Sequence, residues 1–266
     1  MQRELKQKIA FVIFVAGVLT ACKRSEPSAP DEGREAKIVA PARVETKEPT
    51  PEYNTLEALA YGLRGHVQSV EATSYNTYDN NGTLEESGVN SQYSIAFDAW
   101  GHIVHDEWGN VYEYDTEGSF YRGNHVYTTV KRDEKGRVIS YKDASDGEDD
   151  ESNATYSFSY DKAGRLAKIA IAGWTGTYEE SRSYKGNTRH PSSIAWNSTD
   201  EGGGMEEGNT TYRYSRFDET GNWIERTCVA STTTHTEVLV NDSVSDKITV
   251  SEQITVERRV ISYFNL

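Results

Sequence analysis

A short unit recurs along the chain after residue 77: an aromatic residue, Asp, two variable residues, Gly, a variable residue and an apolar residue. Tyr160 to Leu166 is a clear copy, and Arg132 replaces the aromatic residue in another. In a four-residue turn, Asp at the first position accepts hydrogen bonds from the amides ahead of it. Gly supplies the positive φ that returns the chain. Each unit therefore predicts a β-hairpin tip. The turn residues of the six units are Asp79 and Gly82, Asp98 and Gly101, Asp115 and Gly118, Asp133 and Gly136, Asp161 and Gly164, and Asp218 and Gly221.

The segments between these turns alternate apolar and polar residues. Tyr93, Ile95 and Phe97 share one parity. Residues 247–264 place Ile248, Val250, Ile254, Val256 and Val260 on one parity, which indicates a single long or bent strand. The first four aspartates are 19, 17 and 18 residues apart, which we interpret as two strands and two turns per interval. The sequence therefore predicts an all-β fold, a β-meander of consecutive antiparallel hairpins forming a long curled or two-layered sheet.

One short helix is expected before the first strand, over residues 54–62. Asn54 can cap it, Glu57 follows three residues later, and Gly62 ends it. Leu56 and Leu59 lie on one face.

The run Tyr156 to Leu166, followed by Ile169, resembles the YD repeat of RHS-type proteins, and the resemblance covers about residues 66–228. It implies consecutive antiparallel hairpins in a long curled sheet, which in large family members closes into a shell around a toxin. Six or seven units are too few for such a shell, and no toxin region follows, so the toxin role does not carry over. The chain resembles small uncharacterised exported lipoproteins built from these units.

The N-terminus carries a basic start, then an uncharged apolar run from Ile9 to Leu19, then Leu19-Thr20-Ala21-Cys22. This layout resembles the lipobox of bacterial lipoproteins. The resemblance implies a signal peptide over residues 1–21 and a lipidated Cys22 that anchors the protein in membrane lipid. Lys23 follows the cysteine, which favours the outer membrane over retention at the inner membrane.

Residues 22–53 form the expected anchor and tether, and residues 54–266 the β domain. The segment from Lys23 to Tyr53 holds five of the six prolines and lacks hydrophobic periodicity, so we expect it to be disordered and extended.

The charge limits which partners the chain can bind, and the cysteine content limits which disulfides it can form. Removing residues 1–21 takes away three basic residues and one acidic residue, so the net charge of −14 becomes −16. Such a charge repels nucleic acid. Once Cys22 is lipidated only Cys228 remains, so no intramolecular disulfide forms, and Cys228 is expected to be a small buried residue.

The chain has 17 tyrosines and five tryptophans. Most of these rings are expected in the core. Trp100, Trp108 and Trp174 lie in or beside turns, so they are candidates for an exposed platform that stacks on sugar rings, with packing as the alternative.

Catalytic and metal candidates are weak. His102 and His105 face opposite sides of a strand, the acidic residues 143–151 do not have the spacing of a calcium loop, and the glycine-rich run 201–208 is expected to be a flexible loop. We expect no cofactor, no metal and no enzymatic activity. The predicted function is a non-enzymatic envelope lipoprotein that binds a glycan or protein partner or serves as a repeat scaffold. Alternatives are an enzyme acting on envelope or extracellular polysaccharide, or an accessory or immunity protein linked to RHS-type toxins.

Overall fold

The computed structural model describes residues 55–114, 120–122, 125–145, 154–173, 175–240 and 243–265. Cys22, the tether, the Asp115–Gly118 turn, the acidic residues 146–151 and Trp174 lie outside the described residues. The elements are α2 (Leu56–Tyr61), β1 (Val67–Asn80), β2 (Thr83–Phe97), β3 (Ile103–His105), β4 (Tyr112–Tyr114), β5 (Phe120–Arg122), β6 (His125–Arg132), β7 (Val138–Ser145), β8 (Ala154–Tyr160), β9 (Leu166–Gly173), β10 (Gly176–Ser183), β11 (Ser193–Asp200), β12 (Met205–Phe217), β13 (Trp223–Val240) and β14 (Ser243–Tyr263).

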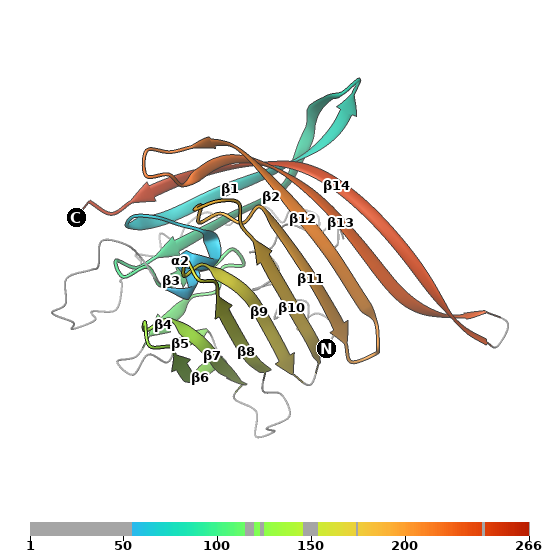
Figure 1. Ribbon diagram of the computed structural model, residues 1–266, viewed down its shortest axis with the longest axis horizontal. Coiled ribbons are helices and arrows are strands. Elements are labelled where there is room, and N and C mark those ends of the chain that lie inside the picture. Colours follow the sequence, from blue (N-terminus) through green and yellow to red (C-terminus); the bar gives the residue numbers. More distant parts are fainter. Residues whose placement is uncertain are drawn as a thin grey trace, which may run out of the picture.

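These strands form one antiparallel sheet in the order β3-β2-β1-β14-β13-β12-β11-β10-β9-β8-β7-β6-β5-β4. Strands that follow each other in the sequence pair with each other, except β3 and β4, and one pairing joins strands that are far apart in the sequence. The last strand, β14, pairs with β1, and β3 meets β4 only through the isolated bridge between His105 and Val111. The sheet curls around α2 without closing (Figure 1). The all-β meander prediction is confirmed, and of the two predicted forms the structure shows the curled single sheet.

The concave face of the curl holds the main core. Strand alternation puts Ala154, Tyr156 and Phe158 of β8 inward, and the Tyr156 ring stacks on Tyr141 of β7 at 4.7 Å between centroids. Leu56 and Ala58 of α2 join the same cluster. The helix therefore fills the end of the curl that a single sheet leaves open, because both faces of an uncovered sheet would contact water.

The N-cap of the helix lies one residue later than the cap predicted from the sequence. The Thr55 side chain accepts from the amide of Ala58, while Gly62 ends the helix in the left-handed conformation, as predicted. Thr55 also donates to the carbonyl of Gly101 at 2.6 Å, which ties the start of the helix to the Asp98 turn.

The turn units have the predicted geometry. In the Asp161 unit, Oδ1 accepts from the amides of Ala163 and Arg165, each at 2.9 Å, and the amide of Gly164 donates to the Asp161 carbonyl. Gly164 has φ +83°. The turns at Asp98, Asp133 and Asp218 repeat the Gly-to-Asp backbone bond and the left-handed glycine.

Three predictions about turns need correction. In the first unit, Asp79 accepts from the amide of Gly82 at 2.6 Å and Gly82 has positive φ, as predicted, but the loop is a two-residue hairpin of Asn81 and Gly82 and Asp79 lies in β1. The interval from Asp79 to Asp98 therefore holds one strand, β2, and not two. The glycine-rich run is no flexible loop, because Asp200 to Gly204 forms another Asp turn and β12 begins at Met205. A similar turn, from Asp106 to Asn110, also escaped the sequence pattern.

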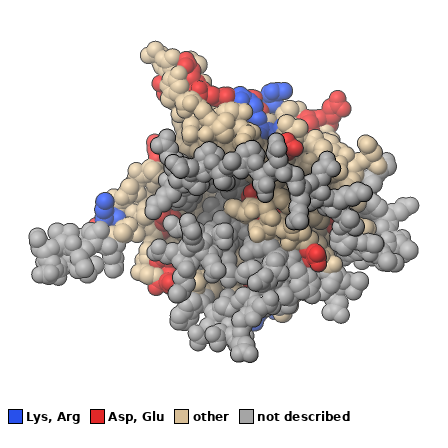
Figure 2. Space-filling view, turned by 180° about the vertical axis from the view of Figure 1, so that it is seen from behind, with Lys and Arg blue, Asp and Glu red and all other residues tan. Residues whose placement is uncertain are grey.

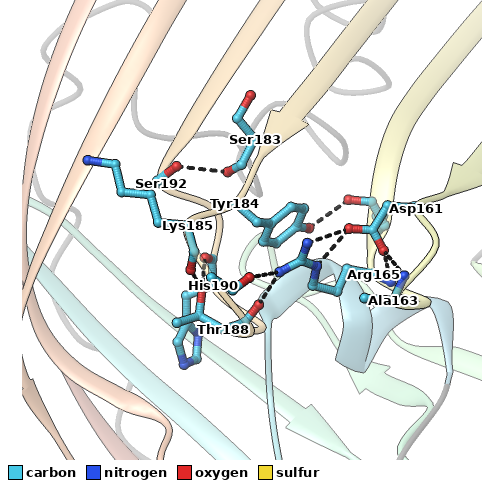
Figure 3. Close-up of polar contacts among 11 residues, drawn as sticks. Asp161, Ala163, Arg165, Ser183, Tyr184, Lys185, Thr188, His190 and Ser192 are labelled. Atoms are coloured by element: carbon cyan, nitrogen blue, oxygen red, sulfur yellow. Dashed lines mark hydrogen bonds and ion pairs between the residues drawn. The ribbon is translucent and has the colours of Figure 1, made fainter.

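In three units the residue after the glycine links its turn to the next aromatic residue along the sheet. Arg165 donates to Asp161 Oδ2 at 2.7 Å, and its guanidinium lies 4.3 Å from the centroid of the Tyr184 ring. The same guanidinium donates to the carbonyls of Gly186 and Thr188, and the Tyr184 hydroxyl donates back to the Leu166 carbonyl at 2.6 Å (Figure 3).

This link recurs along the sheet. Arg137 pairs with Asp133 and lies 4.1 Å over the ring of Tyr160, whose hydroxyl donates to the Val138 carbonyl. His102 lies against Tyr114 at 4.8 Å between rings, and the Tyr114 hydroxyl donates to the Ile103 carbonyl. Tyr114, Tyr160 and Tyr184 therefore each hold the start of the strand that leaves the preceding turn.

Gly164→Val should lower the free energy of unfolding by about 1–2 kcal/mol, since a β-branched residue is forced into left-handed backbone. The matched control is Lys162→Val, an exposed position of the same turn that has no positive φ. Urea unfolding of both variants measures the difference, and equal midpoints would contradict the turn assignment.

Arg165→Lys should cost about 1–2 kcal/mol of unfolding free energy, because lysine keeps the charge but loses the planar fork and its stacking on Tyr184. Lys168 pairs with Glu179 at 3.1 Å on the exposed surface, so Lys168→Met should change stability by less than about 0.5 kcal/mol. A similar loss in both variants, measured by urea unfolding, would argue against the linkage between turns.

Candidate functional site

The carboxyl end of α2 is held by arginines from the sheet. Arg182 of β10 donates to the Ala60 carbonyl at 2.7 Å, and Arg259 of β14 donates to the Tyr61 carbonyl at 3.5 Å. The last carbonyls of a helix have no partner within the helix, so these bonds satisfy groups that burial would otherwise leave unpaired. We call Arg182, Arg259 and His190 the latch.

Carboxylates and aromatic rings contact the arginines of the latch. Arg182 pairs with Glu180 at 2.5 Å, and Tyr178 donates to the same carboxylate. Burial by itself lowers the pKa of Arg182, but the Glu180 carboxylate outweighs it, so the pKa is raised. Arg259 lies 3.5 Å from the centroid of the Trp223 ring.

A second buried ion pair, between Arg226 and Glu257, lies on the neighbouring strands β13 and β14. The Arg226 guanidinium also lies 4.1 Å from the centroid of the Trp223 ring. Because these buried groups bind one another or backbone carbonyls, we interpret the cluster as structural and not as acid–base machinery.

His190 completes the latch. It is 4% exposed, and its Nε2 lies 3.1 Å from the Gly221 carbonyl, so the neutral ring donates there. Burial, together with the smaller effect of the nearby arginines, lowers the pKa of His190 to about 4. Protonation would place an uncompensated charge beside them.

Acid should therefore weaken the latch. Between pH 6.5 and pH 4, His190 is protonated in the unfolded chain but stays neutral in the folded protein. The contribution of the neutral ring to stability is therefore present above pH 6.5 and is lost as the pH falls toward 4. The difference in unfolding free energy between the natural protein and His190→Gln should shrink by about 1–3 kcal/mol between pH 7 and pH 4. Urea unfolding across this range measures it, and a difference independent of pH would contradict the assignment.

Two of the three candidate tryptophans, Trp100 and Trp108, lie among the described residues. Trp108 is 36% exposed and Trp100 is half-buried, in the two turns on either side of the three-residue strand β3. Trp174 lies outside the described residues. The structure therefore leaves one exposed tryptophan, Trp108, as a candidate for sugar stacking.

Among the described residues, no group of three or more His, Cys, Asp or Glu side chains could hold a metal ion. His102 faces Glu57 at 3.9 Å and stacks on Tyr114. Cys228 is buried, as predicted, and burial raises its pKa to about 12. A thiol in that state is a weak nucleophile.

The sheet branches where β1 leaves β14. β14 pairs with β13 from Ser243 onward, but its pairing with β1 starts only at Thr255, opposite Asn76. Beyond Asn76, β1 continues with β2 alone. In the part of the chain that the structure describes, β14 has no strand partner on its other side from Asp246 to Gln253. We call Asp246–Gln253 the open edge.

Irregular pairing explains the branch. The β1–β2 ladder shifts register between Ser74 and Tyr75 and again between Asn76 and Thr77. Bulges bend and twist a hairpin, and in Figure 1 the β1–β2 tip turns away from the β13–β14 tip. Two side-chain bonds mark the branch point: Thr77 Oγ1 donates to the Ile254 carbonyl at 2.8 Å, and Gln253 Nε2 donates to Asn76 Oδ1 at 2.9 Å.

Apolar side chains on the open edge face outward. Ile248 and Val250 are 58% and 63% exposed. Farther along β14, where both neighbours are paired, the buried parity instead carries Thr255, Glu257 and Arg259. The shared parity of the Ile and Val residues predicted the long strand correctly, but it gave no signal of which face is buried. The open edge escaped sequence reasoning because it depends on where pairing with β1 stops.

No protein-family model matches the chain, and no curated protein matches it. Among solved structures, a porin-like protein from Bacteroides vulgatus is similar, at 10% identity and a TM-score of 0.35, over 75% of this chain and 99% of that one. At this level the similarity carries no conclusion about function. No helix among the described residues is long and apolar enough to cross a membrane.

Proposed function

We propose that this protein is a non-enzymatic, lipid-anchored protein of the bacterial envelope that binds a partner protein by accepting an extended segment beside β14. The open edge carries the proposal. An unpaired strand edge presents a row of backbone donors and acceptors, and proteins that do not use such an edge cover or shorten it.

The rest of the fold supports a binding role. Pairing with β13 holds the open edge in the extended conformation that an added strand needs. Preorganisation lowers the conformational entropy lost on binding. The tether expected over residues 22–53 would let this sheet stand away from the lipid surface.

A glycan is the second candidate partner, because Trp108 is exposed beside an edge of the sheet. A thermal-shift screen of the Cys22→Ala protein with purified envelope glycans separates the two. A ligand that binds only the folded state raises the melting temperature. A shift that Trp108→Ala abolishes would support the glycan candidate.

The anchor has a direct test. Cys22→Ala should move the protein from the membrane fraction to the soluble fraction and abolish incorporation of labelled palmitate, since thioether attachment needs the cysteine sulfur. Cys228→Ala is the matched control and should stay in the membrane fraction. Membrane association of the Cys22→Ala protein would contradict lipid anchoring at this residue.

A further inference from the structure

We propose that the open edge selects a cationic extended segment in which apolar residues alternate with Lys or Arg. This inference rests on the proposed function and gives the chemistry of the partner. Three features of the edge lead to it: its backbone, its outward side chains and the charge around it.

The backbone of the open edge sets the conformation of the ligand. Residues Asp246–Gln253 pair with β13 on one side only, so alternate N–H and C=O groups on the other side have no strand partner among the described residues. An added strand satisfies them in register. The β1–β2 hairpin diverges from β14 on that side, because its ladder with β14 ends at Asn76.

The outward side chains set the apolar positions. Ile248 and Val250 lie two residues apart on the same face and are both more than half exposed. Residues of an added strand on that face would lie beside them, and β-branched or aromatic side chains pair best across neighbouring strands. The ligand therefore needs apolar residues at alternate positions.

The charge around the open edge determines which residues the ligand needs at its remaining positions. The open edge contributes Asp246 and Glu252 against Lys247, and Asp79 lies on the β1 side of the branch. The whole chain has a net charge of −14, and on the described part of the face in Figure 2 acidic side chains are widely spread. A cationic segment gains both attraction at long range and partners at the edge.

A second copy of this chain fits less well. Twofold antiparallel pairing of two open edges centred on Thr249 would place Asp246 opposite Glu252 twice. Like charges directly opposite each other destabilise strand pairs. We therefore assign the edge to a different protein.

The test uses the full-length Cys22→Ala protein and labelled synthetic peptides of about eight residues. One peptide alternates Val with Lys, and the other alternates Val with Glu. Fluorescence anisotropy should show the Lys peptide binding at least about tenfold more tightly than the Glu peptide, a difference that shrinks at high salt. Two further Lys peptides carry N-methyl groups on alternate residues, one on each parity. Only the parity whose amides face β14 should abolish binding, because methylation removes the donor.

Matched variants locate the site. Val250→Lys should weaken binding of the Lys peptide at least about tenfold by replacing an apolar contact with a like charge. Val260→Lys, at another exposed valine of β14 that lies outside the open edge and pairs with Glu71 of β1, should bind as the Cys22→Ala protein does.

The outcomes distinguish this inference from the proposed function. Equal binding of the Lys and Glu peptides, with N-methylation still selective by parity, would overturn the cationic preference and leave strand addition in place. Binding insensitive to N-methylation and to Val250→Lys, or no binding at all, would overturn both. A concentration-dependent dimer that Val250→Lys disrupts would assign the edge to a second copy instead.

Discussion

The fold depends on burying one face of a single sheet. Fourteen strands in one layer have no second sheet to pack against, and the described part of the chain contains one helix of six residues. Curling buries one face of the sheet, because a small helix is enough to cover the concave side of a strongly bent sheet. Tyr141, Tyr156, Tyr178 and Trp196 supply large rings that fill the remaining space on the concave face.

The plug creates a second requirement, since its terminal carbonyls enter the apolar end of the curl. Arg182 and Arg259 satisfy them, and the arginines need carboxylates in turn. This explains why β10 and β14 direct charged residues inward at places where strands normally bury apolar ones. The cluster couples α2 to strands that are far apart in the sequence but share one end of the curl.

Strand length creates the candidate binding site. β13 and β14 form a hairpin longer than its neighbours can cover, and β1 bends away where its pairing with β2 becomes irregular. Among the described strands, β14 has neighbours on both sides near Arg259 but on one side only near Val250. One end of β14 is therefore paired with both β1 and β13, and the other end is paired with β13 alone.

The sequence by itself determined the all-β class and most of the hairpin tips. The Asp and Gly of each turn unit act within a few residues, so the hairpin tips at Asp98, Asp133, Asp161 and Asp218 were predictable, and alternation predicted the strands between them. Local patterns also explain the errors at Asp79 and Asp200, where the loop length or the residues around Asp differ from the unit. The inward face of β14, the latch around Arg182 and Arg259, and the open edge were decided only by the tertiary structure. Each depends on which distant strand lies alongside and where that pairing stops, and the free energy of long-range pairing is not encoded in the residues of one strand alone.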